Sequence, residues 1–280
     1  MQPKHLKPVS PLWKRYRRLL ILTGCLLICL GGIWSVHTHR AVSAQKVTSP
    51  ATPAPVTTTQ IRHQQRQVKA ELKRYLHQQT ADGTTSISFY NLGALPKSAA
   101  AKDHLTKTFY QPGQLAVSAH AHTAEVSAST YKLYIAAYLF TVHRQTHTAW
   151  TPTDQAGFEN MILHSANDFS EATLAQSGLS ALNQFIHSEH WTTPVFISGE
   201  AAQTTAASLT LVLRQLATQR APFDHAADQQ WLLKLMRHQD YRTGIPAGAQ
   251  TAQRGTTVAD KVGWFADTNN DAGIVTLPNG

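Results

Sequence analysis

The spacing of apolar residues along the chain predicts several helices. The clearest is VSASTYKLYIAAYLF, residues 126–140, in which the part from Thr130 onward has no Gly, no Pro and only one charge. Such a run predicts a buried helix that begins near Ser129. Apolar side chains also recur at helical spacing over residues 61–79, among many Gln and basic residues, which predicts an amphipathic helix. Shorter apolar stretches predict further helices over 158–163, 169–176, 205–218 and around Trp231.

Alternating or β-rich stretches predict strands near both ends of this region. Residues 84–92 (TTSISFYNL) alternate and predict a strand, and 115–118 predict a second, shorter one. Between them, 94–111 are typical of a polar loop. Near the C-terminal end, 257–266 and 272–277 are β-rich, and the polar residues 267–271 between them predict the turn of a hairpin.

The order of these elements is helix, strand, a long and mainly helical middle, then a hairpin. It predicts an α+β fold in which an antiparallel sheet is assembled from both ends of the chain, is flanked by helices and carries an inserted all-helical lobe. Polar residues mark boundaries within the middle. Residues 150–155 predict a turn, Asp168 with Glu171 predicts a capping box, and Asp224 predicts the cap of the helix around Trp231.

The N-terminal segment has the pattern of a membrane anchor. Residues 1–18 are rich in Lys and Arg, and residues 19–36 follow without a charge, which is just long enough to span a bilayer. The basic flank predicts a cytoplasmic tail, a single span and a body outside the cytoplasm. Residues 37–60 are a Pro/Thr-rich linker, which leaves 61–280 as the folded domain. Cleavage after Val42-Ser43-Ala44 is the first alternative, and lipidation at Cys25 is a more distant one.

Composition restricts the function classes. Hydrophobic residues make up 42% and charged residues 15% of the chain, as in a globular protein, and the net charge is +9. No basic block or nucleic-acid motif occurs in the body, so we expect no nucleic-acid partner; the charge favours anionic wall polymers or lipid instead. Cys25 and Cys29, the two cysteines, both lie in the apolar N-terminal segment, so we expect no disulfide in the body. The 15 histidines form no H-E-x-x-H or Cys/His cluster, and we expect neither a metal nor a cofactor.

Ser129 and Lys132 form an S-x-x-K motif at the start of the predicted central helix. Residues i and i+3 of a helix share a face, so the two side chains would lie side by side. A serine hydroxyl becomes a good nucleophile only when a neighbouring base takes its proton, and a lysine whose pKa is lowered by burial can be that base. The backbone N–H of a serine at a helix N-terminus can also help to hold an oxyanion. A lone S-x-x-K is more often a chance match.

Two further motifs follow in order: S-x-N at Ser165–Asn167, and K-x-G at Lys261–Gly263. Together the three motifs resemble the signature of class A β-lactamases and penicillin-binding proteins. The resemblance covers roughly residue 61 to the end. It extends to other phrases of that family: FENMI at 158–162, TTA at 204–206, RTGIPAG at 242–248 and NDAGIV at 270–275.

The resemblance implies a role for each motif residue. Ser129 would be the acylated nucleophile, Lys132 its base, and Ser165 a proton relay to the leaving nitrogen. Asn167 would bind the substrate amide and steady Lys132, and Lys261 would attract the substrate carboxylate. In the K-x-G strand, Gly263 would line the substrate, and the N–H groups of Ser129 and Trp264 would form the oxyanion hole. Without the other motifs, Ser165 and Asn167 would be read as turn residues, and Lys261 as an exposed strand lysine.

Three departures from the family pattern affect the expected activity. Val262 replaces the hydroxyl residue of the third motif, which weakens carboxylate recognition by about 1–3 kcal/mol. Glu189 and Glu200, the glutamates between 178 and 204, do not fit the family's deacylating glutamate, so we expect slow deacylation. The family also has another strand and a long C-terminal helix after the position of Val275, and neither follows within residues 61–280. Either the sequence is incomplete, or those elements are supplied in some other way.

We therefore expect a membrane-anchored, extracytoplasmic serine hydrolase of class A β-lactamase type, which acts as a monomer through an acyl-serine on a β-lactam or cell-wall peptide amide. One alternative is a D,D-peptidase-like penicillin-binding protein. Another, from a different class, is a cell-envelope binding protein that keeps the cleft but has lost turnover.

Overall fold

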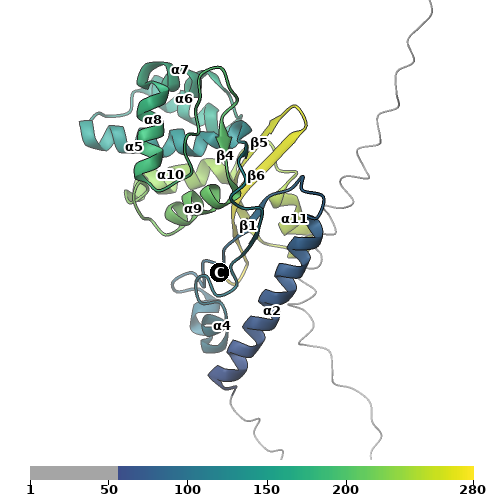
Figure 1. Ribbon diagram of the computed structural model, residues 1–280. Helices are drawn as coiled ribbons and strands as arrows, with labels where there is room; N and C mark the ends of the chain where they lie inside the picture. Colours follow the sequence, from purple (N-terminus) through teal and green to yellow (C-terminus); the bar gives the residue numbers. More distant parts are fainter. Residues whose placement is uncertain (1–55) are drawn as a thin grey trace, which may run out of the picture.

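The computed structural model describes residues 56–280, and Figure 1 shows how its elements group. A lobe of helices lies on one side, the long helix α2 lies on the other, and the C-terminal hairpin projects between them. The α-helices are α2 (Thr58–Gln79), α3 (Ala99–Lys102), α4 (His104–Phe109), α5 (Lys132–Thr146), α6 (Pro152–Leu163), α7 (Asp168–Ser177), α8 (Leu179–Ser188), α9 (Ala206–Ala217), α10 (Ala226–Arg237) and α11 (Ile245–Ala252). The remaining elements are the 3₁₀-helix η1 (Ala128–Tyr131) and the strands β1 (Ile87–Phe89), β2 (Val117–Ala119), β3 (Glu125–Val126), β4 (Gln203–Thr204), β5 (Thr257–Phe265) and β6 (Thr268–Thr276).

Helix α5 is the centre of the hydrophobic core, as its apolar sequence predicts. Tyr134, Ile135 and Phe140 are completely buried, and α6, α7 and α8 pack around the helix. The ring of Phe140 contacts Phe158 of α6 at a centroid distance of 5.4 Å. Burying a side chain of this size contributes about 1.5–3 kcal/mol. The core therefore fixes the helix that begins at Lys132, and the 3₁₀ turn with Ser129 leads directly into it.

Several helix starts are set by caps in the sequence. Thr57 accepts from the backbone N–H of Gln60, whose side chain bonds back to Thr57, so α2 begins at Thr58 and the domain starts three residues before the predicted boundary at 61. The predicted turn over 150–155 is wrong, because Thr151 caps α6 and Pro152 is its first residue.

The α+β class is confirmed, with helices and small sheets, but the predicted single sheet is wrong. The described strands form three separate antiparallel pairs, β1–β2, β3–β4 and β5–β6. Strands from the two ends of the region are not paired with each other, and helix α9 packs against both β1 and β6. The Thr210 hydroxyl of α9 donates to the carbonyl of Ser88 in β1 (3.4 Å). Contacts with α9 therefore connect strands that share no ladder.

Two segments between the predicted elements also differ from expectation. The expected loop over 94–111 contains α3 and α4, whose first turns are capped by the side chains of Ser98 and Asp103. The expected turn over 267–271 is much tighter: Phe265 pairs with Thr268, so only Ala266 and Asp267 lie between the strands. Polar composition alone did not distinguish a strand facing solvent from a loop.

The predicted cap of α10 is also wrong. Asp224 does not cap the helix, which begins after His225 without a side-chain cap. The Asp224 carboxylate instead accepts from the guanidinium of Arg144 at the end of α5. An ion pair with a distant helix has therefore replaced the local capping bond.

The predicted membrane anchor at 19–36, the tail at 1–18 and most of the linker lie outside the described residues. Within residues 56–280, every helix is too short or too polar to cross a bilayer. Localisation therefore stays a prediction from the sequence.

Candidate active site

Ser129 lies in η1, the turn that leads into α5, and is half-buried. The turn is fixed by its buried neighbours: the Thr130 hydroxyl donates to the carbonyl of Ser127 (2.7 Å), and the two hydroxyl groups lie 2.9 Å apart. Asn270 of β6 donates to the carbonyls of Val126 (2.7 Å) and Ser127 (3.0 Å). The segment that presents the Ser129 hydroxyl is thus held by both its own turn and the hairpin.

Lys132, the first residue of α5, meets all the polar groups of the first two motifs. Its Nζ lies 3.0 Å from Ser129 Oγ, 2.7 Å from Asn167 Oδ1, and 2.6 Å and 3.4 Å from the carbonyl and hydroxyl oxygens of Ser165. The side chain is fully buried, and burial lowers the pKa of Lys132 to about 8, against an opposing effect of the Glu171 carboxylate. The group can therefore lose its proton near neutral pH, as a base must.

Ser165 and Asn167 lie on the short connection between α6 and α7. Ser165 has φ of 58°, a left-handed conformation that is uncommon for residues other than glycine. This turn places both its carbonyl and its hydroxyl against Lys132. Asn167 is the N-cap residue of α7, but its side chain makes no capping bond because Oδ1 accepts from Lys132. The capping box predicted from Asp168 and Glu171 is therefore wrong, and the cap position serves the site.

Lys261 lies in the middle of β5 and is fully buried, so it is not an exposed strand lysine. Its Nζ lies 3.0 Å from Ser165 Oγ and 3.0 Å from the carbonyl of Val262. Burial and the charge of Lys132 lower the pKa of Lys261 to about 7. The hydroxyl of Ser165 therefore lies between the two amines, one from each side of the site.

Gly263 brings β5 into contact with η1. A β-carbon at this position would lie 2.6 Å from the backbone nitrogen of Ser129 and 2.9 Å from that of Thr130. No residue with a side chain fits there without moving the strand or the turn. The close approach places the strand that contains Gly263 and Trp264 beside the backbone of the expected nucleophile.

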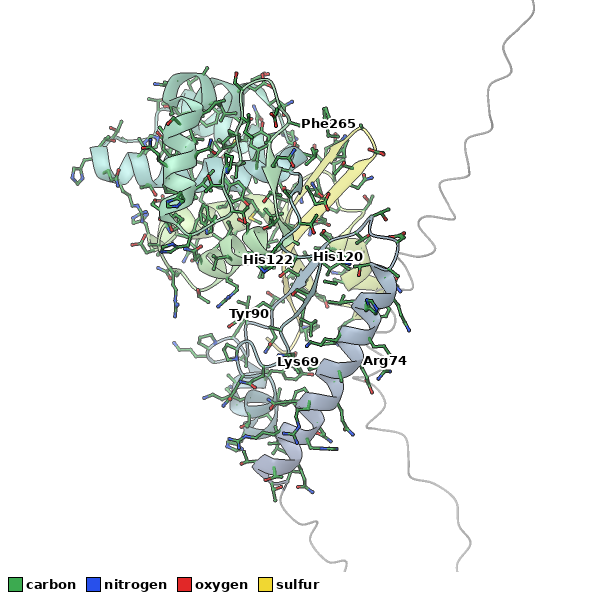
Figure 2. All side chains as sticks on the ribbon, viewed as in Figure 1. Lys69, Arg74, Tyr90, His120, His122 and Phe265 are labelled. Atoms are coloured by element: carbon green, nitrogen blue, oxygen red, sulfur yellow. The ribbon has the colours of Figure 1, made fainter. Side chains whose placement is uncertain are left out.

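The side chains that follow Gly263 are open to solvent. Trp264 is 48% and Phe265 58% exposed, and Trp264 packs edge-to-face on Tyr241 at a centroid distance of 4.6 Å. Figure 2 shows Phe265 near the free end of the hairpin. The exposed pair of Trp264 and Tyr241 thus lies next to the site. The sequence predicted a role for Trp264 only through its backbone.

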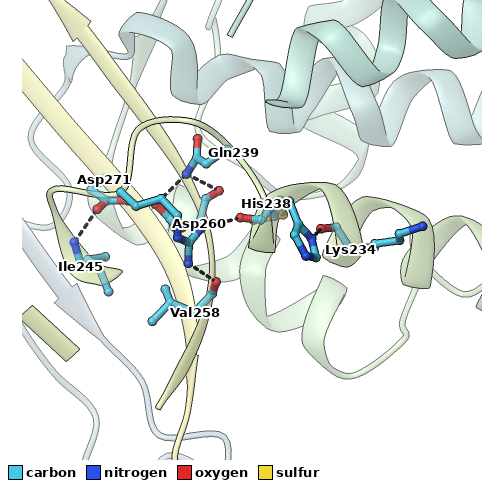
Figure 3. A network of polar contacts seen from close by, with 9 residues as sticks. Lys234, His238, Gln239, Ile245, Val258, Asp260 and Asp271 are labelled. Atoms are coloured by element: carbon cyan, nitrogen blue, oxygen red, sulfur yellow. Dashed lines mark hydrogen bonds and ion pairs between the residues drawn. The ribbon is translucent and has the colours of Figure 1, made fainter. Parts of the chain in front are cut away.

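Figure 3 shows a buried acidic network that contains Asp260, the residue before Lys261 in β5. Asp260 accepts from Gln239 (2.6 Å) and Arg242 (3.0 Å), and its own side chain has no exposed surface. Asp271, on the paired strand, accepts from the backbone N–H of Ile245 (2.6 Å). The network connects the strand of Lys261 to the segment that joins α10 and α11.

The two carboxyl groups of this network affect each other's ionisation. Asp271 Oδ1 accepts no hydrogen bond from the described N–H and hydroxyl groups. Burial raises the pKa of Asp271 to about 7, with a further contribution from Asp260, and burial raises the pKa of Asp260 to about 6 against the effect of Arg242. Of the two, Asp271 therefore keeps its proton to the higher pH. Gly244 leaves room for it, since a β-carbon there would clash with its carboxylate.

Val262, Glu189 and Glu200 are the residues that depart from the family pattern. Val262 is 7% exposed and presents no hydroxyl between Lys261 and Gly263. Glu189 ends α8, and its carboxylate accepts from Gln215 of α9 (3.2 Å), so it is engaged away from Ser129. Glu200 is exposed in the loop before β4.

Sequence reasoning missed the residues that support the motifs. Asp260 has a signal, since an acidic residue within the β-rich run before Lys261 is unusual in a buried strand. Asn270 was read as part of a turn, although it lies opposite Gly263 in the hairpin. The pairing of Asp260 with Asp271 has no local signal, because it depends on the strand register.

The comparisons with known proteins concern the sequence family and the fold. Residues 157–280 match the model of the Beta-lactamase enzyme family, a stretch that includes Ser165, Asn167 and Lys261. No curated protein matches the sequence. Among solved structures, a β-lactamase from Burkholderia phymatum is 17% identical, with a TM-score of 0.54. The match covers 76% of this chain and 86% of the Burkholderia chain.

Two other solved structures support the same fold. A β-lactamase from Chitinophaga pinensis is 17% identical with a TM-score of 0.52, covering 79% of this chain and 86% of its own. One from Sphaerobacter thermophilus is 16% identical with a TM-score of 0.50, covering 58% and 74%. Residues 157–280 are therefore similar in sequence to the Beta-lactamase enzyme family, and the chain has a β-lactamase-like fold over the larger part of its length.

Proposed function

We propose that the chain is an active-site serine hydrolase that forms an acyl intermediate on Ser129, from a β-lactam or a cell-wall peptide amide. One observation carries the proposal: the buried Lys132 ammonium lies within hydrogen-bond distance of Ser129 Oγ, Ser165 and Asn167 at once. A structural lysine needs counter-charges, yet here its partners are neutral oxygens and its pKa is lowered. That combination is typical of a base in a reaction.

In the acylation step, neutral Lys132 takes the proton of Ser129 Oγ, 3.0 Å away, as Oγ attacks the carbonyl carbon. The leaving nitrogen must then gain a proton. Ser165 Oγ is the relay, because it lies 3.4 Å from Lys132 Nζ and 3.0 Å from Lys261 Nζ. Its proton passes to the leaving nitrogen and is replaced by the proton that Lys132 took from Ser129, which leaves Lys132 neutral in the acyl-enzyme.

The two remaining needs of the reaction are met by β5 and η1. The backbone N–H groups of Ser129 and Trp264 stabilise the oxyanion, and the contact of Gly263 with the Ser129 nitrogen keeps the two segments together. Charged Lys261 attracts the substrate carboxylate. The side chain of Asn167 accepts a hydrogen bond from Lys132 through Oδ1, and it also hydrogen-bonds the substrate amide.

The test is the intact mass of the protein after mixing with benzylpenicillin, beside Ser129→Ala. We expect the wild type to gain the mass of one penicillin and the variant to gain none. A long-lived adduct supports a penicillin-binding type, and rapid loss with hydrolysed drug supports a β-lactamase. An unmodified, folded wild type would contradict β-lactam recognition.

A second candidate function is a cell-envelope binding protein without turnover. The observation in its favour is Val262, a buried apolar side chain where carboxylate recognition benefits from a hydroxyl. Reversible, non-covalent binding of a peptidoglycan peptide by both wild type and Ser129→Ala would support it. For either function we propose an extracytoplasmic location, on the pattern of residues 1–36 alone.

A further inference from the structure

Hydrolysis through an acyl-serine needs a second proton acceptor. The ester on Ser129 is released when water attacks its carbonyl carbon, and water attacks fast only if a base takes one of its protons. The glutamates considered in the sequence do not meet this need, since Glu189 is bonded to Gln215 and Glu200 lies in an exposed loop. Another carboxylate near Lys132 must therefore supply the base.

Glu171 lies in the first turn of α7, four residues after Asn167. Side chains at i and i+4 of a helix lie on the same face, one turn apart. The Asn167 side chain on that face reaches Lys132 Nζ at 2.7 Å. The Glu171 carboxylate is therefore on the face of α7 that is turned to the site.

The first turn of α7 is held against the nucleophile's turn by the residue beside Glu171. The Ser170 hydroxyl lies 3.0 Å from that of Tyr131, the last residue of η1, and also donates to the carbonyl of Asn167 (2.8 Å). Glu171 itself is exposed, so solvent reaches its carboxylate. Its charge raises the pKa of Lys132 against the effect of burial.

We propose that Glu171 is the base of deacylation, which rests on Ser129 being acylated as proposed above. Glu171 takes a proton from a water molecule as the water oxygen bonds to the acyl carbon. The tetrahedral intermediate then collapses, the bond from that carbon to Ser129 Oγ breaks, and Oγ receives, through Lys132 Nζ, the proton that Glu171 took from water. Lys132 is left neutral and Glu171 ionised, as before the step. The products are free Ser129 and a carboxylic acid.

Asp168 supplies a matched control. It is acidic, exposed and in the same helical turn, but it follows Asn167 directly and so lies about 100° around the helix from it. Asp168→Asn and Glu171→Gln remove the same charge from the same turn. Only the second removes a carboxylate from the face that bears Asn167.

The experiment measures acylation and deacylation rates separately in these variants. The probes are benzylpenicillin and p-nitrophenyl acetate, an activated ester that acylates a reactive serine without needing β-lactam recognition. We expect Glu171→Gln to keep the burst of acylation and to release the acyl group about a hundredfold more slowly, at the low end of general-base effects. Asp168→Asn should stay within about twofold of the wild type, and formate should restore part of the rate to Glu171→Ala.

The outcomes separate this inference from the proposed function. Equal deacylation in wild type and Glu171→Gln, or equal slowing in both acidic variants, would overturn the role of Glu171 while acylation stands. Acylation by the ester but not by penicillin would overturn the substrate class and leave the Glu171 test intact. A folded wild type that neither probe acylates would overturn both proposals.

Discussion

Gly263 lies so close to Ser129 that a β-carbon on the glycine would stand 2.6 Å from the serine's backbone nitrogen. Gly263→Ala should therefore push β5 away from η1 and misplace the oxyanion donors. We expect kcat/KM for acylation to fall at least about a hundredfold, because small displacements of reacting groups have effects of that size. The measurement is the second-order acylation rate with benzylpenicillin.

The loss of acylation rate in Gly263→Ala, expressed as a free energy, should be much larger than any change in its free energy of unfolding. Thr257→Ala, at the exposed start of the same strand, is the control and should keep the wild-type rate. If Gly263→Ala acylates normally, the contact between the strand and the turn has no part in the reaction.

The two lysines predict a bell-shaped dependence of kcat/KM on pH. Lys132 must be neutral to accept a proton, so the rate rises with pH through its pKa of about 8. Lys261 must be charged to attract a carboxylate, so binding weakens as pH rises through its pKa of about 7. The product of the two fractions is largest at about pH 7.5.

A single substrate can show which lysine causes each limb of the pH profile. An activated ester without a carboxylate does not use the charge of Lys261, so its profile should keep the acidic limb and lose the alkaline one. A profile with both limbs for that ester would show that Lys261 has another role.

Val262→Thr should improve recognition of substrates that carry a carboxylate. The side chain lies between Lys261 and Gly263, and the substitution exchanges a methyl group for a hydroxyl at nearly constant volume. A hydrogen bond to a charged group contributes about 1.5–3 kcal/mol, so we expect kcat/KM to rise about tenfold. Val258→Thr makes the same change four residues earlier in β5 and should bring no gain; equal effects would contradict the prediction.

The acidic pair should make stability depend on pH. The pKa of Asp271 is about 7 in the folded chain, above its value of 3.8 when unfolded. A raised pKa means that the contribution of the protonated carboxyl is complete below about pH 4 and is lost as pH rises through about 7. Urea unfolding at several pH values should show the wild type losing at least about 1 kcal/mol between pH 5 and pH 8 relative to Asp271→Asn.

The variant keeps a donor to Asp260 but cannot ionise, which is why its stability should stay flat over this range. Asp267→Asn, in the exposed turn of the hairpin, should follow the wild-type curve. Parallel curves for wild type and Asp271→Asn would mean that the pair is not protonated in the folded chain.

Local pattern was enough to predict much of the fold. The apolar run after Thr130 predicted the buried helix α5, and Thr205 with the residues after it predicted the start of α9, which Thr205 caps. Sheet pairing was not predicted, because it depends on which distant segments meet. Thr210 of α9 contacts β1, and nothing near Ser88 in the sequence indicates that a helix would cover it.

The motif residues were predicted as a set, and the structure brings Ser129, Lys132, Ser165, Asn167 and Lys261 together. Their supports were not predicted. Asn167 looked like a residue before a capping box, whereas its side chain turns to Lys132, because a buried amine gains more from a partner than an exposed helix end does. Asp271 was read as a turn residue, since its burial follows only from the register of the hairpin.

The contact between Lys261 and Ser165 joins residues 96 positions apart, and that between Asn270 and Ser127 joins residues 143 positions apart. Ser129 and Lys132 are neighbours in sequence and can meet early in folding, whereas such long loops close late. The reactive serine thus acquires its full surroundings only when the last segment of the chain docks. On heating, undocking of the hairpin should abolish acylation while the helical lobe is still folded.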